Sequence, residues 1–130
     1  MSNFKKKKLK VTIVEDEEDL LTLYREYLVS LGYDIVSSYL SANNIMAEFD
    51  KKFPDICLID YRFSGKTNGL DVAIKILEKY PSMPIMFFTG YQLLNKEIEK
   101  IPILKDKKIQ VLVKPVMLRE IQKTMLKLTE

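Results

Sequence analysis

Five short segments rich in β-branched and aromatic residues alternate with five amphipathic segments, and this alternation constrains the fold more than any other feature. Segments of the first kind favour strands, whereas apolar residues at helical spacing predict helices that bury one face. Strands that alternate with helices are typical of a parallel sheet covered on both sides. The sequence predicts strands at 10–14, 34–39, 55–60, 84–89 and 109–113, and helices at 19–31, 42–53, 70–80, 92–100 and 117–128.

Right-handed crossovers leave few topologies for five strand–helix units, and the strand order 2-1-3-4-5 is a common one. We therefore predict an α/β fold, a flavodoxin-like (βα)5 three-layer sandwich with a parallel five-stranded sheet in that order. The segments 10–14, 55–60 and 84–89 have the most continuous apolar runs, so they are expected in the centre. The first helix is expected to end at Gly32 and to bury one face, made by Leu20, Tyr24, Tyr27, Leu28 and Leu31.

The length of 130 residues, of which 47% are hydrophobic and 30% charged, indicates one globular domain. We expect residues 9–130 to form this domain and residues 1–8, with Lys5 to Lys8, to be a solvated basic tail. The apolar runs are too short for a membrane span or a signal peptide, and Cys57 is the single cysteine. These features predict a cytoplasmic protein. No basic helix with interleaved aromatic residues is present, so direct nucleic-acid binding is not expected.

Polar residues follow the carboxyl ends of the predicted strands, where parallel sheets bind ligands. Glu15 and Asp16 come after the first strand, Asp60 ends the third, Thr89 ends the fourth and Lys114 follows the fifth. Three neighbouring carboxylates repel one another and need a cation. Because the chain has no histidine and its one cysteine is expected to be buried, a hard ion such as Mg²⁺ fits best. A carboxylate beside such an ion can also serve as a nucleophile and form an aspartyl-phosphate.

Each of these residues also has a purely structural interpretation. The acidic run 15–18 suits the first turn of a helix, where carboxylates are favoured. Thr89 with Gly90 can be an ordinary strand exit, and Lys114 with Pro115 a solvated turn. The functional interpretation rests on their occurrence together, and above all on Asp60, which ends an apolar strand.

Four short motifs carry a resemblance to a known family. They are VEDEEDL (14–20), PDICLID (54–60), FFTG (87–90) and VKP (113–115), and their order and spacing resemble those of the receiver domains of two-component response regulators. The resemblance extends from about residue 9 to the end of the chain.

The resemblance implies a metal site and a phosphoacceptor. Asp60 would accept the phosphoryl group and also bind Mg²⁺, for which Mn²⁺ is an acceptable substitute. Asp16 would be the more direct ligand and Glu15 would act largely through water. Arg62 would contribute its backbone carbonyl to the ion.

The resemblance also implies partners and a mode of action. Thr89 would place its hydroxyl on a phosphate oxygen, and Lys114 would pair with the phosphoryl group. The peptide bond from Lys114 to Pro115 would be cis. The donor would be a sensor histidine kinase or a phosphotransfer protein. The chain would then act as a stand-alone regulator, not as an enzyme beyond its own phosphorylation and dephosphorylation. It would signal to a protein target, or form a homodimer, through the surface of helix 4, strand 5 and helix 5.

Some positions depart from the family pattern. Val111 stands where an aromatic residue usually lies, and the loop after Asp60 reaches Gly69 one residue late and has Ser64 in place of a proline. Arg62 and Tyr91 are large and occupy the two positions that, by resemblance, tune loss of the phosphoryl group.

Three other functions compete with this interpretation. The departures favour a receiver-like interaction module that does not depend on phosphorylation. An aspartate phosphatase is disfavoured because no carboxylate lies two residues after Asp60, and an FMN binder because no phosphate-binding loop follows the first strand. The segment 93–104 is unusually apolar, and we expect most of its apolar side chains to be core and some to remain at the surface.

Overall fold

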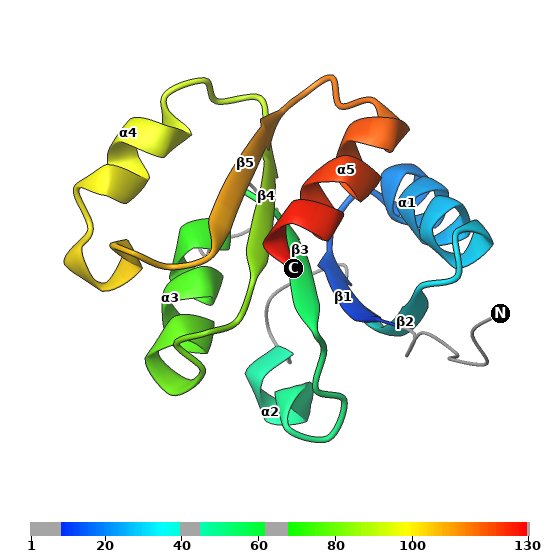
Figure 1. Ribbon diagram of the computed structural model, residues 1–130, viewed down its shortest axis with the longest axis horizontal. Coiled ribbons are helices and arrows are strands. Elements are labelled where there is room, and N and C mark those ends of the chain that lie inside the picture. Colours follow the sequence, from blue (N-terminus) through cyan, green and yellow to red (C-terminus); the bar gives the residue numbers. More distant parts are fainter. Residues whose placement is uncertain (1–8, 40–44, 62–67, 130) are drawn as a thin grey trace, which may run out of the picture.

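A parallel five-stranded sheet in the order β2-β1-β3-β4-β5 forms the centre of the computed structural model, which describes residues 9–39, 45–61 and 68–129 (Figure 1). The predicted fold class and strand order are confirmed. The strands are β1 (Lys10–Val14), β2 (Asp34–Tyr39), β3 (Ile56–Asp60), β4 (Ile85–Thr89) and β5 (Ile109–Val113). The helices are α1 (Glu18–Ser30), α2 (Ile45–Phe49), α3 (Gly69–Lys79), α4 (Leu94–Glu99) and α5 (Leu118–Leu128), with a 3-10 turn η1 (Pro102–Leu104) between α4 and β5.

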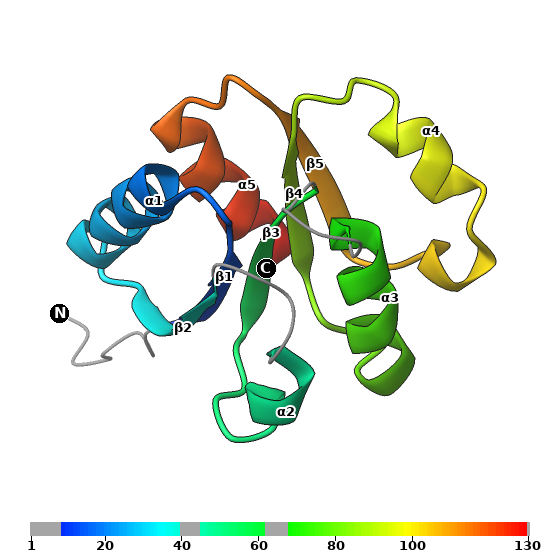
Figure 2. The same cartoon turned by 180° about the vertical axis from the view of Figure 1, so that it is seen from behind.

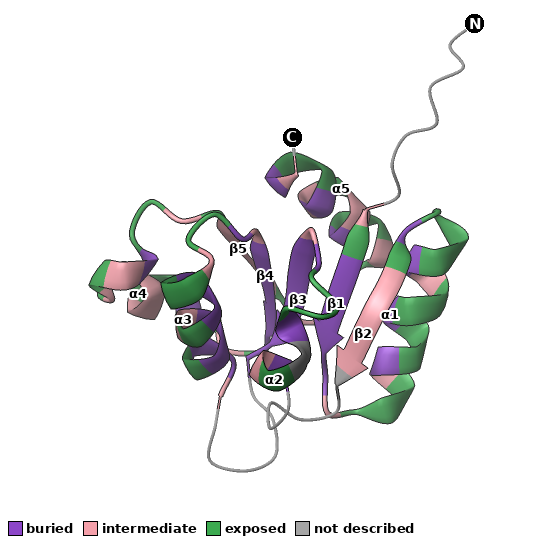
Figure 3. Cartoon of the chain, turned by 90° about the horizontal axis from the view of Figure 1, so that it is seen from below, coloured by how far each residue is buried: buried purple, intermediate pink, exposed green. Residues whose placement is uncertain are grey.

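The three apolar strands lie in the centre of the sheet, as the sequence predicts. Every residue of β3 and β4 is buried, whereas the described side chains of β2 and β5 are only partly buried or exposed (Figure 3). Each central strand is covered on both faces by helices, so both sets of alternating side chains are apolar. The sheet therefore separates two hydrophobic cores.

Helices α1 and α5 cover one face of the sheet, and α2, α3 and α4 cover the other (Figures 1 and 2). On β3, Ile56 and Leu58 face the α1/α5 side while Cys57 and Ile59 face the α3 side. This alternation along one strand fixes the register of the sheet, because a slip of one residue would exchange the two cores.

Helix α1 buries Leu21, Tyr24 and Leu28, and its C-terminus is followed by Gly32 with a φ of 95°. Glycine reaches this left-handed conformation without strain, so the predicted helix stop is confirmed. The predicted buried face was wrong at its end. Leu31 is the C-cap residue, in the turn after the helix, and is 38% exposed, whereas Leu28 in the last helical turn is fully buried.

The described part of the second helix is shorter than the sequence predicts. Residues 42–44 lie outside the described residues, and α2 ends at Phe49 rather than at Phe53. Pro54 disfavours helical geometry in the residue before it. Phe53 therefore lies beyond the helix, is 44% exposed, and contacts Tyr80 edge-on with ring centroids 4.9 Å apart.

The apolar segment 93–104 lies mostly against the core, as expected. Leu94 and Leu104 are buried, and Ile98, Ile101 and Ile103 pack partly against the α3-side core. Leu93 is the exception, with half of its surface exposed. Within 9–39, 45–61 and 68–129, every helix is too short or too polar to cross a membrane. The predicted basic tail 1–8 lies outside these ranges.

Candidate functional site

The five predicted site residues that the structure describes lie at one edge of the sheet. Glu15 follows β1, Asp60 ends β3, Thr89 ends β4 and Lys114 follows β5. Since β1, β3 and β4 are neighbours, their carboxyl ends meet. They surround an open cavity of about 480 Å³, whose lining consists of Glu15, Asp16, Glu17, Asp60, Thr89, Gly90, Tyr91 and Lys114.

Three carboxylates converge in this cavity. Glu15, Asp16 and Asp60 each offer an oxygen, and these oxygens all lie within 4.8 Å of one another. Glu15 is 1% exposed and Asp60 5%, so water cannot screen their repulsion well.

Glu15 gives a direct test of whether this site suits a cation. Its Oε2 accepts a hydrogen bond from the backbone N–H of Glu17 at 3.2 Å. Its Oε1 is buried and accepts no hydrogen bond from any of the described residues. A buried carboxylate oxygen without a donor is costly, and an oxygen-only cluster is the donor set that Mg²⁺ prefers. The residues present therefore fit such an ion.

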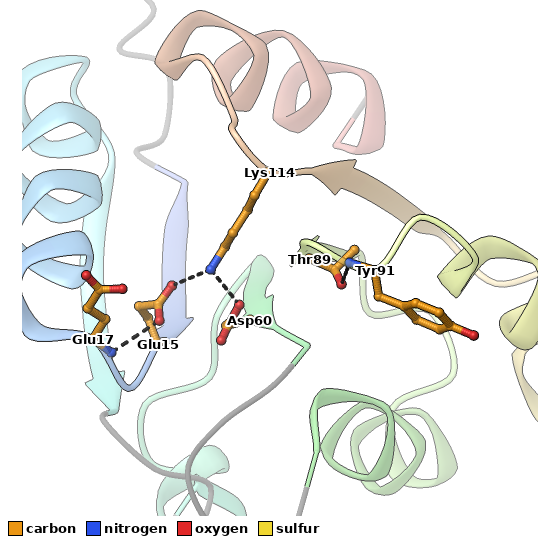
Figure 4. A network of polar contacts seen from close by, with 6 residues as sticks. All are labelled: Glu15, Glu17, Asp60, Thr89, Tyr91 and Lys114. Carbon is orange, nitrogen blue, oxygen red and sulfur yellow. Dashed lines mark hydrogen bonds and ion pairs between the residues drawn. The ribbon is translucent and has the colours of Figure 1, made fainter.

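Lys114 reaches from the end of β5 between two of the carboxylates (Figure 4). Its Nζ lies 2.9 Å from Asp60 Oδ1 and 3.6 Å from Glu15 Oε1. The peptide bond from Lys114 to Pro115 is cis, as the resemblance implied.

The pKa shifts follow from this crowding. Burial raises the pKa of Glu15 from 4.5 to about 7, and the charge of Asp60 adds to the shift. Burial also raises the pKa of Asp60, although its hydrogen bond and ion pair with Lys114 oppose this. Burial lowers the pKa of Lys114, but its bond to Asp60 outweighs that effect and the net shift is upward. One ammonium group therefore does not compensate the cluster, which has room for a divalent cation.

The side chain of Thr89 contacts the backbone of the loop that follows β4. Its Oγ1 accepts a hydrogen bond at 2.8 Å from the backbone N–H of Tyr91 (Figure 4). The ring of Tyr91 points away from Asp60 and stacks on Tyr61, with ring centroids 5.9 Å apart. Its hydroxyl donates a hydrogen bond at 3.1 Å to Glu97. In this arrangement the Tyr91 ring lies away from Asp60.

Gly69 brings the start of α3 against the end of β3. Its N–H donates a hydrogen bond at 2.6 Å to the carbonyl of Tyr61. A Cβ at this position would lie only 2.6 Å from the backbone oxygen of Asp60. Residue 69 must therefore be glycine for the chain to pass this close to Asp60.

A sequence profile of the response regulator receiver domain matches residues 11–126. The chain belongs to this family. Receiver domains are signalling modules of two-component systems and are generally not enzymes; phosphorylation and Mg²⁺ binding at an acidic pocket are features of the family.

Curated relatives support the assignment. The receiver is 31% identical over 87 residues to the luminescence regulatory protein LuxO of Vibrio campbellii, a match that covers 67% of this chain and 19% of LuxO. It is 32% identical over 92 residues to the regulatory protein VanR of Enterococcus faecium, covering 71% of this chain and 37% of VanR. The chain thus spans about a fifth of the length of LuxO.

Solved structures show the same fold. The signal receiver domain of a modulated diguanylate cyclase from Desulfovibrio desulfuricans superposes with a TM-score of 0.79 at 24% identity, over 95% of this chain and 94% of that one. A CheY-like receiver domain from Methanospirillum hungatei gives a TM-score of 0.77 at 23% identity, over 94% of each chain.

The receiver structure thus brings together Glu15, Asp16, Asp60 and Lys114, and it places Thr89 in the same cavity. Arg62, the predicted carbonyl ligand, and Ser64 lie outside the described residues. Two residues at the edge of the site, Tyr61 and Glu97, were not predicted. Their contact joins positions 36 residues apart, and no local sequence pattern indicates it.

Proposed function

We propose that this receiver accepts a phosphoryl group on Asp60 from a phosphohistidine of a partner protein in a Mg²⁺-dependent reaction. The observation that supports this most strongly is the cluster itself. Three carboxylate oxygens lie within 4.8 Å of one another, and the ammonium group of Lys114 contacts Asp60 at 2.9 Å. This is a site for a cation and an anion side by side.

Glu15, Asp16 and Asp60 would hold the metal ion, and the backbone carbonyl of Arg62 remains a proposed further ligand. Bound there, Mg²⁺ would supply positive charge that offsets the negative charge of the transferring group. Mn²⁺ has the same preference for oxygen ligands and is expected to substitute.

The protein's own groups would position the phosphoryl group and offset its negative charge. An oxygen of Asp60 forms a bond to phosphorus while the phosphorus–nitrogen bond of phosphohistidine breaks and its electron pair stays on the imidazole. Lys114, already beside Asp60, would pair with an oxygen of the new phosphoryl group. Thr89 would turn its hydroxyl from the Tyr91 N–H to donate to another oxygen.

The test is to incubate the protein with acetyl phosphate and Mg²⁺ and to measure its intact mass. The proposal predicts the gain of one phosphoryl group, which EDTA or Asp60→Asn prevents. Asp50→Asn is a matched control, because Asp50 pairs with Lys79 on an exposed surface away from the cavity. Phosphoryl gain that persists in Asp60→Asn would contradict the proposal.

A second candidate is a receiver-like interaction module that works without phosphorylation. Val111 favours it, since this partly buried residue packs against the α3-side core where an aromatic side chain was expected. The same mass measurement discriminates between the two, because this candidate predicts no phosphoryl gain in the unaltered protein.

We propose that the output is a contact with another protein, or with a second copy of the chain, through the surface of α4, β5 and α5. Three exposed apolar residues lie on this surface near the site: Leu93, Val113 and Met117. No direct contact with nucleic acid or membrane is proposed. Size-exclusion chromatography with and without acetyl phosphate tests the homodimer.

We further propose that residues 9–130 are the receiver domain, that 1–8 are a basic tail, and that the receiver acts as a stand-alone protein in the cytoplasm. Because the LuxO and VanR relatives are longer than this chain, immunoblotting of the native protein is the direct test. A band well above 15.2 kDa would contradict stand-alone action.

A further inference from the structure

Tyr61 and Tyr91, which follow the ends of β3 and β4 beside the proposed phosphorylation site, both contact one carboxylate of α4. Glu97 accepts a hydrogen bond at 3.1 Å from the hydroxyl of Tyr91 and a longer one at 3.5 Å from the hydroxyl of Tyr61. Tyr61 directly follows Asp60, and Tyr91 lies two residues after Thr89. Tyr61 and Tyr91, which follow the proposed phosphoacceptor and the proposed hydroxyl donor, are therefore both linked to α4 through Glu97.

The two tyrosines also contact each other. Their rings stack at an interplanar angle of 21°, with 5.9 Å between the centroids. Tyr61 is 8% exposed and Tyr91 and Glu97 are partly buried, so water only partly competes for these groups. Hydrogen bonds to a charged acceptor are stronger than neutral ones. The cluster of Tyr61, Tyr91 and Glu97 therefore holds α4 against the ends of β3 and β4.

Thr89 connects this cluster to the site. Its hydroxyl oxygen accepts the backbone N–H of Tyr91 at 2.8 Å, which fixes the start of the loop that carries the Tyr91 ring (Figure 4). If Thr89 turns toward a phosphoryl group on Asp60, that N–H loses its acceptor. The place of Tyr91, and with it the contact to Glu97, then becomes less well defined.

We propose that Glu97 is a positioning residue that couples phosphorylation of Asp60 to the freedom of α4 through Tyr91 and Tyr61. This inference rests on the proposed function and specifies the residues that connect Asp60 to α4. The route does not require an aromatic side chain on β5, where this chain has Val111. Thr89 in contact with the Tyr91 N–H favours the held state of α4, and Thr89 in contact with phosphate favours the released state.

Hydrogen–deuterium exchange of the backbone amides of residues 94–100 tests the coupling. In the wild type, exchange is expected to become about tenfold faster after treatment with acetyl phosphate and Mg²⁺, the effect of losing one charged hydrogen bond. Tyr91→Phe keeps the ring and removes the hydroxyl. It is expected to show fast exchange already without phosphate, and little further increase with it.

Two variants of Glu97 and one control variant separate a coupling role of Glu97 from a purely structural one. Glu97→Gln retains an acceptor and is expected to keep most of the phosphate-dependent change, whereas Glu97→Ala is expected to lose it. Tyr80→Phe, at the other end of α3, should behave as the wild type. If Tyr91→Phe speeds exchange equally in both states, so that the phosphate-dependent change is preserved, Glu97 is only structural and the inference is wrong.

A double-mutant cycle in the unphosphorylated protein keeps this inference separate from the proposed function. Thr89→Val and Tyr91→Phe act on the same connection, so their effects on exchange of residues 94–100 should be less than additive. Additive effects would overturn the coupling. Absence of phosphoryl gain by mass would instead overturn the proposed function, whatever the cycle shows.

Discussion

The ammonium group of Lys114 lies 2.9 Å from Asp60 and 3.6 Å from Glu15, so a single cation contacts two buried carboxylates. Asp16 brings a third carboxylate within the same cluster. In the metal-free protein the charge of these carboxylates is therefore offset by Lys114, and the stability of the protein should respond to a change of charge in the cluster.

Replacement of Lys114 by methionine should destabilise the metal-free protein at pH 8 by about 2 kcal/mol, because it leaves Asp60 and Glu15 buried without a cation. Millimolar Mg²⁺ should recover part of this loss by taking over the compensation. Urea unfolding with and without Mg²⁺ measures both effects.

Lys79→Met is the matched control, since Lys79 pairs with Asp50 at 2.8 Å but both side chains are more than half exposed. This change should cost less than about 1 kcal/mol and should not respond to Mg²⁺. Equal losses for the two lysine variants would show that burial of the carboxylates does not set the effect.

Glu15 should make the metal-free protein less stable as pH rises. Its pKa is raised from 4.5 to about 7 in the folded protein. Between these values the folded protein binds more protons than the unfolded chain, so the free energy of unfolding falls with increasing pH. The stabilising effect is fully present below pH 4.5 and is lost as pH passes about 7.

Glu15→Gln isolates this contribution, because it removes the charge and keeps the shape. The variant and the wild type should be nearly equally stable near pH 4.5, and the variant should be more stable by about 3 kcal/mol at pH 8 in EDTA. Chemical unfolding at a series of pH values gives the difference. Parallel profiles for the two proteins would contradict the assigned pKa.

The sequence predicted the fold because local signals and long-range packing agree in the central strands. Segment 85–88 is apolar at every position, which is what burial on both faces requires. The site was predictable for a related reason: strand order determines which carboxyl ends meet, and polar residues there are conspicuous after apolar runs. Thus Asp60 and Lys114 could be placed together from positions that are far apart in the sequence.

The details that failed depend on individual contacts. Leu31 and Phe53 fit helical spacing, yet each lies beyond a helix end, where the spacing no longer determines which way a side chain points. The contact of Tyr91 with Glu97 depends on how the loop after β4 turns. Neither composition nor periodicity specifies that turn.

The start of α3 should be sensitive to its capping residue. The side chain of Asn68 accepts a hydrogen bond at 3.0 Å from the N–H of Asp71, and the side chain of Asp71 accepts one at 3.3 Å from the N–H of Asn68. Asn68→Ala removes the first of these bonds and should lower stability by about 1 kcal/mol. Lys75→Ala, on the exposed middle of the same helix, should change it by less than about 0.5 kcal/mol in urea unfolding.

Gly69→Ala should be among the most damaging single-methyl additions near the site. The new Cβ would lie 2.6 Å from the carbonyl oxygen of Asp60 and 2.9 Å from Cα of Tyr61, and both are backbone atoms that cannot rotate away. The start of α3 must then shift, at a cost of about 2 kcal/mol. Gly90→Ala is the matched control, because a Cβ there meets nothing within 4 Å. Thermal unfolding compares the two variants, and if Gly69→Ala is no less stable than Gly90→Ala, the close approach of α3 to β3 is wrong.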